Sequence, residues 1–473
     1  MIYIDPNLSI PIYIQLYEAI KEDILDGTYS CGSYLPPIRK LASTLCVSKN
    51  TVDNAYQQLA VEGYIKSRPG AGHIVLDAGN AAGSYRHTKP FQQEKTINPV
   101  IASDENNIKI DFRYGDLSPE FFPNDYWRKA ASHIFSSVES IKMSGYDDAR
   151  GDECLRKAIS SYVREHRGIS STPDQIIICS GFAHSINIAC DLIEKDCHCI
   201  GMEDPGFYSA RDMFRYKGFS FFPLHHYPEN TYFDDLAVSG ADCLYVTPSH
   251  QFPMGGVMPV DVRYRLLNWA SEGNRYIIED DYDSQLRYHS RPVPSLYSLC
   301  TDDRVIYIGT FSKSLSPAIR ISYLVLPRRL ADRYNALPQY RQSYVSWLDQ
   351  RILAKYIEDG AFAKHLRKMN TICCTRHDLM RDLLIEKFGD RIKIFGMNAG
   401  LHMVLKLNDN VSNSKRIRLA QDAGVAVYSI DDCFADLKTA PDNLILIGFG
   451  KVTEDQIRHG LTRLEKVWNL SCV

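Results

Sequence analysis

A lysine, an aspartate, a tyrosine and an arginine occur in the middle of the chain in an order that suits amine chemistry. Lys313 lies in a turn directly after the short apolar run 305–308, while Asp280 and Tyr282 follow a second apolar run, and Arg320 comes shortly after the lysine. A lysine amine can form a Schiff base with an aldehyde, and a carboxylate can keep a ring nitrogen protonated. Arginine is a good phosphate ligand. Together these residues suit a phosphorylated aldehyde, pyridoxal 5'-phosphate.

Each of these residues has a simpler explanation when it is considered alone. A lone lysine such as Lys313 is more often a solvated charge, and a lone aspartate such as Asp280 is more often a helix N-cap. The pair Ser180-Gly181 follows an apolar run and opens a helical pattern, where backbone N–H groups and the helix dipole suit a phosphate. Alone it is a weak signal. The order of these residues, each at or just past a predicted strand end, favours the cofactor interpretation.

The elements that must position these residues alternate between short apolar runs and longer helical patterns. Helical periodicity is clear over 262–272, and a long helical stretch follows residue 344. This alternation predicts an α/β fold with a mostly parallel sheet, whose ligands bind at the carboxyl ends of the strands. Two later strand candidates predict a smaller C-terminal α/β subdomain. The predicted strands are 176–179, 199–202, 243–246, 276–278 and 305–308 in the main sheet, and 403–407 and 444–447 in the subdomain.

The first 76 residues predict a separate, DNA-binding module. Helical patterns cover 12–25 and 38–45, and Ser48 is a suitable N-cap for a third helix that ends near residue 62. Two short helices joined by such a turn form a helix-turn-helix, whose second helix can enter the major groove. The segment 64–76 predicts a two-stranded wing.

Charge gives the module an alternative interpretation, a small helical domain without a nucleic-acid role. Residues 1–76 hold six Lys/Arg against seven Asp/Glu, a net charge of −1, whereas DNA readers usually carry a basic patch. The distribution of charge favours DNA binding nevertheless. The acids cluster on the first helix, whereas the bases fall on the second helix, the start of the third and the wing; these are Arg39, Lys40, Lys49, Lys66 and Arg68.

The remaining features bound the class of protein. Residues 77–107 have no apolar periodicity and predict a linker between the module 1–76 and a large domain, 108–473. The chain has 473 residues, 45% of them hydrophobic, with a net charge of −3 and no apolar run long enough for a membrane span. Its 13 cysteines show no disulfide or zinc spacing. We expect a cytoplasmic protein without a metal site.

The module resembles the winged helix of GntR-type regulators along its full length. The shared patterns are P-x-Y-x-Q-L, L-P-P-x-R-x-L-A, V-S-K-N-T-V-x-x-A-Y-x-x-L and E-G-Y-I-x-S-x-P-G-x-G. The resemblance implies that Arg39 and Lys49 contact double-stranded DNA beside Ser48 and Thr51. It also implies that Gly70 and Gly72 shape the wing. Family members usually have arginine at position 49, and lysine loses the bidentate recognition of guanine.

The large domain resembles fold-type I aminotransferases over nearly all of 108–473. Joined to the winged helix, it looks like the MocR subgroup of GntR regulators. The patterns that carry this resemblance are S-G-F, E-D-P-G-F, T-P-S-H-Q-F-P-M-G, R-Y-I-I-E-D-D-Y-D-S-Q and F-S-K-S-L-S-P-A-I-R.

The resemblance assigns cofactor roles to individual residues. It implies that Lys313 forms the Schiff base, Asp280 pairs with the ring nitrogen, Tyr282 bonds the ring oxygen and Phe207 stacks on the ring. Tyr146 would reach the phosphate of a neighbouring subunit, which implies a homodimer. The phosphate ligands implied within one subunit are Ser180, Gly181, Thr310, Ser312 and Arg320.

Two departures from the aminotransferase pattern bear on activity. The asparagine that donates to the ring oxygen is replaced by Phe252, and His250 or Gln251 could substitute for it. The arginine that binds an α-carboxylate is absent from the segment Leu446-Ile447, although a cation could enter from elsewhere in the fold.

Three functional hypotheses remain. The leading one is a regulator that holds pyridoxal phosphate and senses a small amine or the cofactor itself. The second is a working aminotransferase with an accessory N-terminal domain, and the missing arginine weighs against it. The third is a scaffold without the cofactor, and the intact lysine, aspartate and tyrosine weigh against that.

Overall fold

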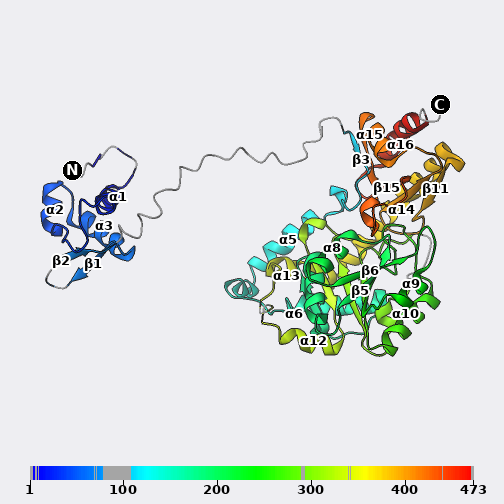
Figure 1. Ribbon diagram of the computed structural model, residues 1–473, viewed down its shortest axis with the longest axis horizontal. Helices are drawn as coiled ribbons and strands as arrows, with labels where there is room; N and C mark the ends of the chain where they lie inside the picture. The colour runs from blue at the N-terminus through cyan, green and yellow to red at the C-terminus, as the bar shows by residue number, and fades with distance from the viewer. Residues whose placement is uncertain are drawn as a thin grey trace. The chain divides into compact units, whose positions relative to one another are not determined.

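The chain forms two compact units, 1–103 and 104–473, in the computed structural model (Figure 1). The structure describes residues 4–5, 8, 10–68, 70, 72–77, 108–288, 293–338, 340, 342–438 and 440–469. Apart from Asp77, the predicted linker lies outside these described residues.

The small unit is a three-helix fold followed by a hairpin. Its elements are α1 (Ile12–Leu25), α2 (Ile38–Thr44), α3 (Lys49–Val61) and the antiparallel strands β1 (Ile65–Arg68) and β2 (Gly72–Val75). The apolar stripe of α1 packs against α3, and Leu16, Val52 and Leu59 are fully buried between them. This burial fixes the angle of α3, the predicted recognition helix, whose residues at the N-terminal end stay exposed.

A seven-stranded sheet forms the centre of the large unit. The order is β4-β10-β9-β8-β7-β5-β6, and β10 runs antiparallel to both of its neighbours, while the other pairs are parallel. The predicted mostly parallel sheet is therefore confirmed. The strands are β4 (Ile176–Cys179), β5 (Cys199–Asp204), β6 (Ser220–His225), β7 (Cys243–Val246), β8 (Tyr276–Asp281), β9 (Val305–Thr310) and β10 (Ser322–Val325).

Helices cover both faces of this sheet. Ile177 and Cys179 of β4 pack on the side of α7 (Phe182–Ile193), whereas Ile176 and Ile178 pack on the side of α6 (Glu153–Arg167). Burial on both faces explains why the strands are continuous apolar runs rather than alternating ones. The other helices of this part of the large unit are α5 (Asn124–Phe135), α8 (Tyr208–Tyr216), α9 (Tyr232–Val238), α10 (Val260–Glu272), α11 (Leu296–Leu299), α12 (Arg328–Asn335) and α13 (Trp347–Glu358).

The long helix α14 (Ala361–Phe388) leads into a smaller subdomain, coloured orange to red in Figure 1. Its antiparallel sheet has the order β11-β12-β15-β14. A short parallel pair joins β13 (Val425–Ala426) to β3 (Ile110–Asp111), so the start of the large unit is held against its end. The other elements are β11 (Ile392–Phe395), β12 (His402–Leu407), β14 (Tyr428–Ser429), β15 (Leu444–Gly448), α15 (Asn413–Asp422) and α16 (Glu454–Asn469).

Within the described residues, no helix has the length and apolar character needed to cross a membrane. No group of three or more His, Cys, Asp or Glu in those residues could hold a metal ion.

Candidate functional site

Lys313 lies in a cavity of about 560 Å³, directly after β9. Its Nζ donates a hydrogen bond of 3.2 Å to the carbonyl oxygen of Gly115 and lies 4.5 Å from the ring centroid of Tyr114. Burial lowers the pKa of Lys313 to about 8, although Asp283 and Asp116 act in the opposite direction. The side chain is therefore an amine with an unusually large neutral fraction near neutral pH.

Asp280 lies in the same cavity, within β8 rather than just past the strand end. Its Oδ2 accepts a hydrogen bond of 2.5 Å from the hydroxyl of Tyr245 on β7. The pKa of Asp280 is raised to about 7, chiefly by burial, and the neighbouring Asp281 and Asp283 contribute in the same direction. A buried carboxylate with this pKa would be stabilised in its charged form by a cation in the cavity.

The two neighbours of Asp280 on β8 point to the other face of the sheet and are already paired. Asp281 accepts a hydrogen bond of 2.5 Å from Tyr307 and forms an ion pair with the buried Arg167, whose Nε lies 2.7 Å from Oδ2 of Asp281. Glu279 accepts two backbone N–H groups at the start of α11. Alternation along the strand therefore leaves Asp280 as the carboxylate of β8 that faces the cavity.

Arg320 and Gly181 are in close contact on another wall of the cavity. Arg320 lines the cavity, and a Cβ atom at Gly181 would lie 2.2 Å from its Nη2, so a larger residue at position 181 would displace the guanidinium. Arg320 also adopts a left-handed backbone conformation, with φ of 51°, which costs free energy in a residue that is not glycine. Packing therefore holds this guanidinium against the start of α7.

The remaining predicted phosphate ligands are near this wall. Thr310 and Ser312 line the cavity, and the Thr310 hydroxyl accepts the Ser312 backbone N–H at 3.1 Å. The Ser180 N–H donates to Nδ1 of His184 at 3.0 Å, so it is already engaged. The first N–H groups of α7 have no partner inside the helix and remain available for an anion.

Aromatic rings form the apolar part of the cavity. Phe207, the predicted stacking residue, lines it and lies 5.0 Å from the ring of Phe182 and 5.3 Å from that of Phe252. Tyr282 also lines the cavity, but its hydroxyl donates to the carbonyl oxygen of His250 at 2.7 Å. A ring oxygen in the cavity would therefore compete with this carbonyl for the Tyr282 proton.

The suggested substitutes for the missing asparagine are engaged elsewhere. Nδ1 of His250 lies 2.8 Å from Asp283, and the amide of Gln251 donates to the carbonyl oxygens of Pro205 and Phe252. Neither side chain is among the described residues that line the cavity, whereas Phe252 is. This wall of the cavity is therefore apolar where aminotransferases have an amide.

The structure adds residues that the sequence did not single out. Leu446 lines the cavity at the position expected of a carboxylate-binding arginine, but Arg113 lines it as well, from the segment after β3. Tyr114, Thr247 and Tyr428 are among the other lining residues that the sequence analysis did not single out. In the sequence, the one signal for Arg113 and Tyr114 was that these polar side chains directly follow the short strand β3.

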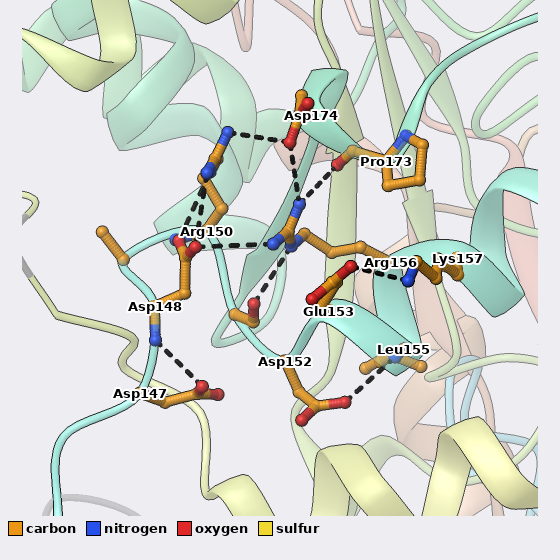
Figure 2. A network of polar contacts seen from close by, with 12 residues as sticks. Asp147, Asp148, Arg150, Asp152, Glu153, Leu155, Arg156, Lys157, Pro173 and Asp174 are labelled. Carbon is orange, nitrogen blue, oxygen red and sulfur yellow. Dashed lines mark hydrogen bonds and ion pairs between the residues drawn. The ribbon is translucent and has the colours of Figure 1, made fainter.

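Tyr146 is 87% exposed and lies outside this cavity. The segment that follows it is fixed by the ion-pair network in Figure 2. Arg156 is buried and lies 3.5 Å from both Asp148 and Asp174, and Arg150 also contacts both carboxylates. The Tyr146 ring is therefore presented outward from an anchored loop.

The predicted DNA-contacting residues lie on the small unit. Arg39 is exposed in the first turn of α2, and Lys49 is the exposed first residue of α3. The Ser48 hydroxyl accepts the Thr51 N–H at 3.1 Å and caps α3. Gly70 and Gly72, also predicted, have φ of 79° and 99° in the hairpin, a conformation that favours glycine. No ligand defines their roles, which stay predictions.

The fold of the large unit and the placement of Lys313 define an aminotransferase-like protein. The family model "Aminotransferase class I and II" matches residues 108–464, and "Bacterial regulatory proteins, gntR family" matches residues 12–75. The crystal structure of Pyrococcus horikoshii kynurenine aminotransferase in complex with PMP is 25% identical, with a TM-score of 0.69. That match covers 78% of this chain and 93% of the other.

Relatives of full length combine both parts. The HTH-type transcriptional regulator YhdI of Bacillus subtilis is 35% identical, covering 98% of this chain and 97% of the relative. The protein named "Probable rhizopine catabolism regulatory protein MocR", from Rhizobium meliloti, is 31% identical, covering 99% and 96%. The chain belongs to the MocR subgroup of GntR-type transcriptional regulators.

Proposed function

We propose that this regulator binds double-stranded DNA through its winged helix and holds pyridoxal 5'-phosphate in the cavity around Lys313. A small amine, or the cofactor itself, is the effector. The observation that carries the proposal is the enclosed lysine amine with a pKa of about 8, which shares one cavity with a buried carboxylate and an arginine.

The residues present fit this cofactor. The close packing of Gly181 against Arg320 leaves a guanidinium and the start of α7 beside the cavity, which suits a phosphate. Asp280 is a buried carboxylate that a protonated ring nitrogen would satisfy. Phe207 offers a ring face to stack on, and Thr310 and Ser312 offer hydroxyls to the phosphate.

Individual residues of the cavity would have the following roles. When bound, the cofactor supplies an aldehyde that primary amines can attack. Lys313 competes with an incoming amine for that position, and its lowered pKa makes it a capable nucleophile. Asp280 holds a proton on the ring nitrogen. Exchange of Lys313 for an effector amine frees a side chain inside the cavity, which can favour one conformation of the protein over another.

A second candidate function is catalysis by the same site, which the aminotransferase fold favours. Leu446 weighs against it, because an apolar side chain lines the cavity where a carboxylate clamp is expected. We therefore place regulation first and leave slow amine exchange as the residual chemistry of the site.

Tyr146 supports a homodimer. An 87% exposed tyrosine on a loop fixed by ion pairs to the buried Arg156 is suited to enter a neighbouring subunit. The exposed Ile141 and Met143 nearby add apolar surface that a second copy could cover.

The test of cofactor attachment is reduction by borohydride. The purified protein should carry a visible absorbance, and reduction followed by peptide mass spectrometry should place the cofactor on Lys313. The Lys313→Ala variant should lose this absorbance and remain folded by circular dichroism. Attachment to a different lysine would contradict the proposal. The matched control is Lys451→Ala, which removes an exposed lysine outside the cavity and should keep the absorbance.

A further inference from the structure

We infer that Arg113, oriented by Tyr428, binds the acidic group of the effector, so that the effector is a small amine with an anionic group rather than a simple amine. This inference rests on the proposed function, since it names the class of ligand for the same cavity. It concerns a residue at a position different from that of the missing arginine.

The lysine and arginine side chains of the cavity have separate roles. Arg113, Lys313 and Arg320 are its lysine and arginine lining residues among those described. In the proposed function Arg320 binds the phosphate and Lys313 is the point of attachment. Arg113 is therefore the cation that remains without a role.

Among the described residues, hydrogen bonds orient the Arg113 guanidinium from one side. Its Nε donates to the Tyr428 hydroxyl at 3.1 Å, and that hydroxyl donates to Oδ1 of Asp111 at 2.7 Å. Asp111 also accepts the Arg113 backbone N–H at 3.0 Å. Within the described residues, no hydrogen bond is formed by Nη1 or Nη2 of Arg113. The two terminal groups of the guanidinium are thus available for a ligand oxygen.

The segment that contains Arg113 lies next to the Lys313 amine. Two residues further along the chain, the carbonyl oxygen of Gly115 accepts from Lys313, and the Tyr114 ring lies beneath the same Nζ. The backbone is held against β15, because a Cβ atom at Gly448 would lie 2.7 Å from the Arg113 carbonyl oxygen. Arg113 and Lys313 therefore line the same cavity.

The neighbouring acids do not cancel this charge. Asp111 lies 3.7 Å from Nε of Arg113, on the side that Tyr428 occupies, and Asp432 is the other acid besides Asp280 on the described cavity wall. The hydrogen bond from Arg113 to Tyr428 raises the pKa of Arg113, which keeps the guanidinium protonated. An anion in the cavity can therefore pair with this charge.

The experiment compares amines that differ only in the acidic group. Glycine, 3-aminopropanoate and 4-aminobutanoate are each mixed with the cofactor-loaded protein beside the corresponding carboxamide, and the absorbance change of the bound cofactor gives an apparent affinity. We expect the wild type to prefer at least one acid over its amide by about tenfold or more, as befits a charge-assisted hydrogen bond. Arg113→Gln should reduce this ratio to about one. Differences in amine basicity cancel, because the same ratio is compared between two proteins.

Controls separate this inference from the proposed function. Arg458→Gln removes an exposed arginine of α16 and should keep the wild-type ratio, while Tyr428→Phe should lower the ratio partly. The inference is overturned if Arg113→Gln keeps the preference for the acid, or if the wild type binds the cofactor but shows no such preference. Absence of cofactor absorbance in the wild type would instead refute the proposed function, and the inference with it.

Discussion

The lowered pKa of Lys313 leads to a prediction about the rate of cofactor attachment. Only the neutral amine attacks an aldehyde, and burial lowers the pKa of this lysine from its ordinary value to about 8. The rate of attachment to the cofactor-free protein should therefore rise with pH and level off above about pH 8, whereas a solvated lysine would keep rising to about pH 10.4. Stopped-flow absorbance from pH 6 to 10 measures it.

A rate that increases tenfold for each pH unit up to pH 9.5 would show that Lys313 is an ordinary lysine. The carboxyl of Asp280 also titrates within this window, at about pH 7. Asp280→Asn therefore serves as the control, because it should remove any inflection near pH 7 and leave the one near pH 8.

The sequence was sufficient to predict several of the residues that share the cavity, but it did not indicate their hydrogen-bond partners. The order of Lys313, Asp280 and Arg320 along the chain was enough to predict that parallel strand ends would bring them together. The partner of Asp280, Tyr245, belongs to a different strand, and its register with β8 is a tertiary property. Arg113 could not be found from its neighbours, because β3 is two residues long and pairs across the chain with β13.

At the scale of elements, the start of α3 carries a prediction about DNA. Lys49 is exposed there, and a phosphate contact by one lysine contributes about one unit to the slope of log affinity against log salt. Lys49→Ala should weaken DNA binding and reduce the slope by about one, and Arg39→Ala on α2 should have a similar effect. Fluorescence anisotropy with operator DNA at several salt concentrations measures both quantities.

The matched control is Lys195→Ala, which removes an exposed lysine of the large unit. It should leave the slope unchanged. If both Lys49→Ala and Arg39→Ala bind DNA with wild-type affinity at low and high salt, α3 is not the recognition helix.

Element boundaries show where local sequence patterns stop being sufficient. The helices of the small unit agree closely with the predicted ranges, because amphipathic periodicity and the Ser48 cap are local signals. The strand β6 was not predicted, since its residues are only partly buried and form an edge of the sheet. The strand β8 runs to Asp281, beyond its apolar residues, because Tyr307 and Arg167 satisfy its charged end.

At the scale of the whole molecule, a regulator must turn occupancy of one site into a change at another. Allosteric coupling of this kind is typically worth about 1–3 kcal/mol. An effector amine can supply it only through contacts that differ between two states of the protein. In the proposed function, release of Lys313 from the cofactor and engagement of Arg113 by an anion would be two such contacts, and both residues belong to the large unit.

The last prediction distinguishes a regulator from an enzyme. A buried arginine clamp orients an α-carboxylate, and losing such an orientation can add several kcal/mol to a barrier. Leu446 cannot provide it, and Arg113 has a side chain that is 56% exposed with one nitrogen already bonded to Tyr428. Common α-amino acids with a keto-acid acceptor should therefore turn over at least about a hundredfold more slowly than in a working aminotransferase.

The measurement follows product formation and DNA binding in the same samples. We expect the amines that change the cofactor absorbance to change DNA affinity as well, with negligible turnover. Lys313→Ala should abolish both responses, whereas Lys49→Ala should weaken DNA binding and leave the absorbance response intact, because the two residues belong to separate units. Rapid multiple turnover of ordinary amino acids with no change in DNA affinity would identify an enzyme and refute the regulatory proposal.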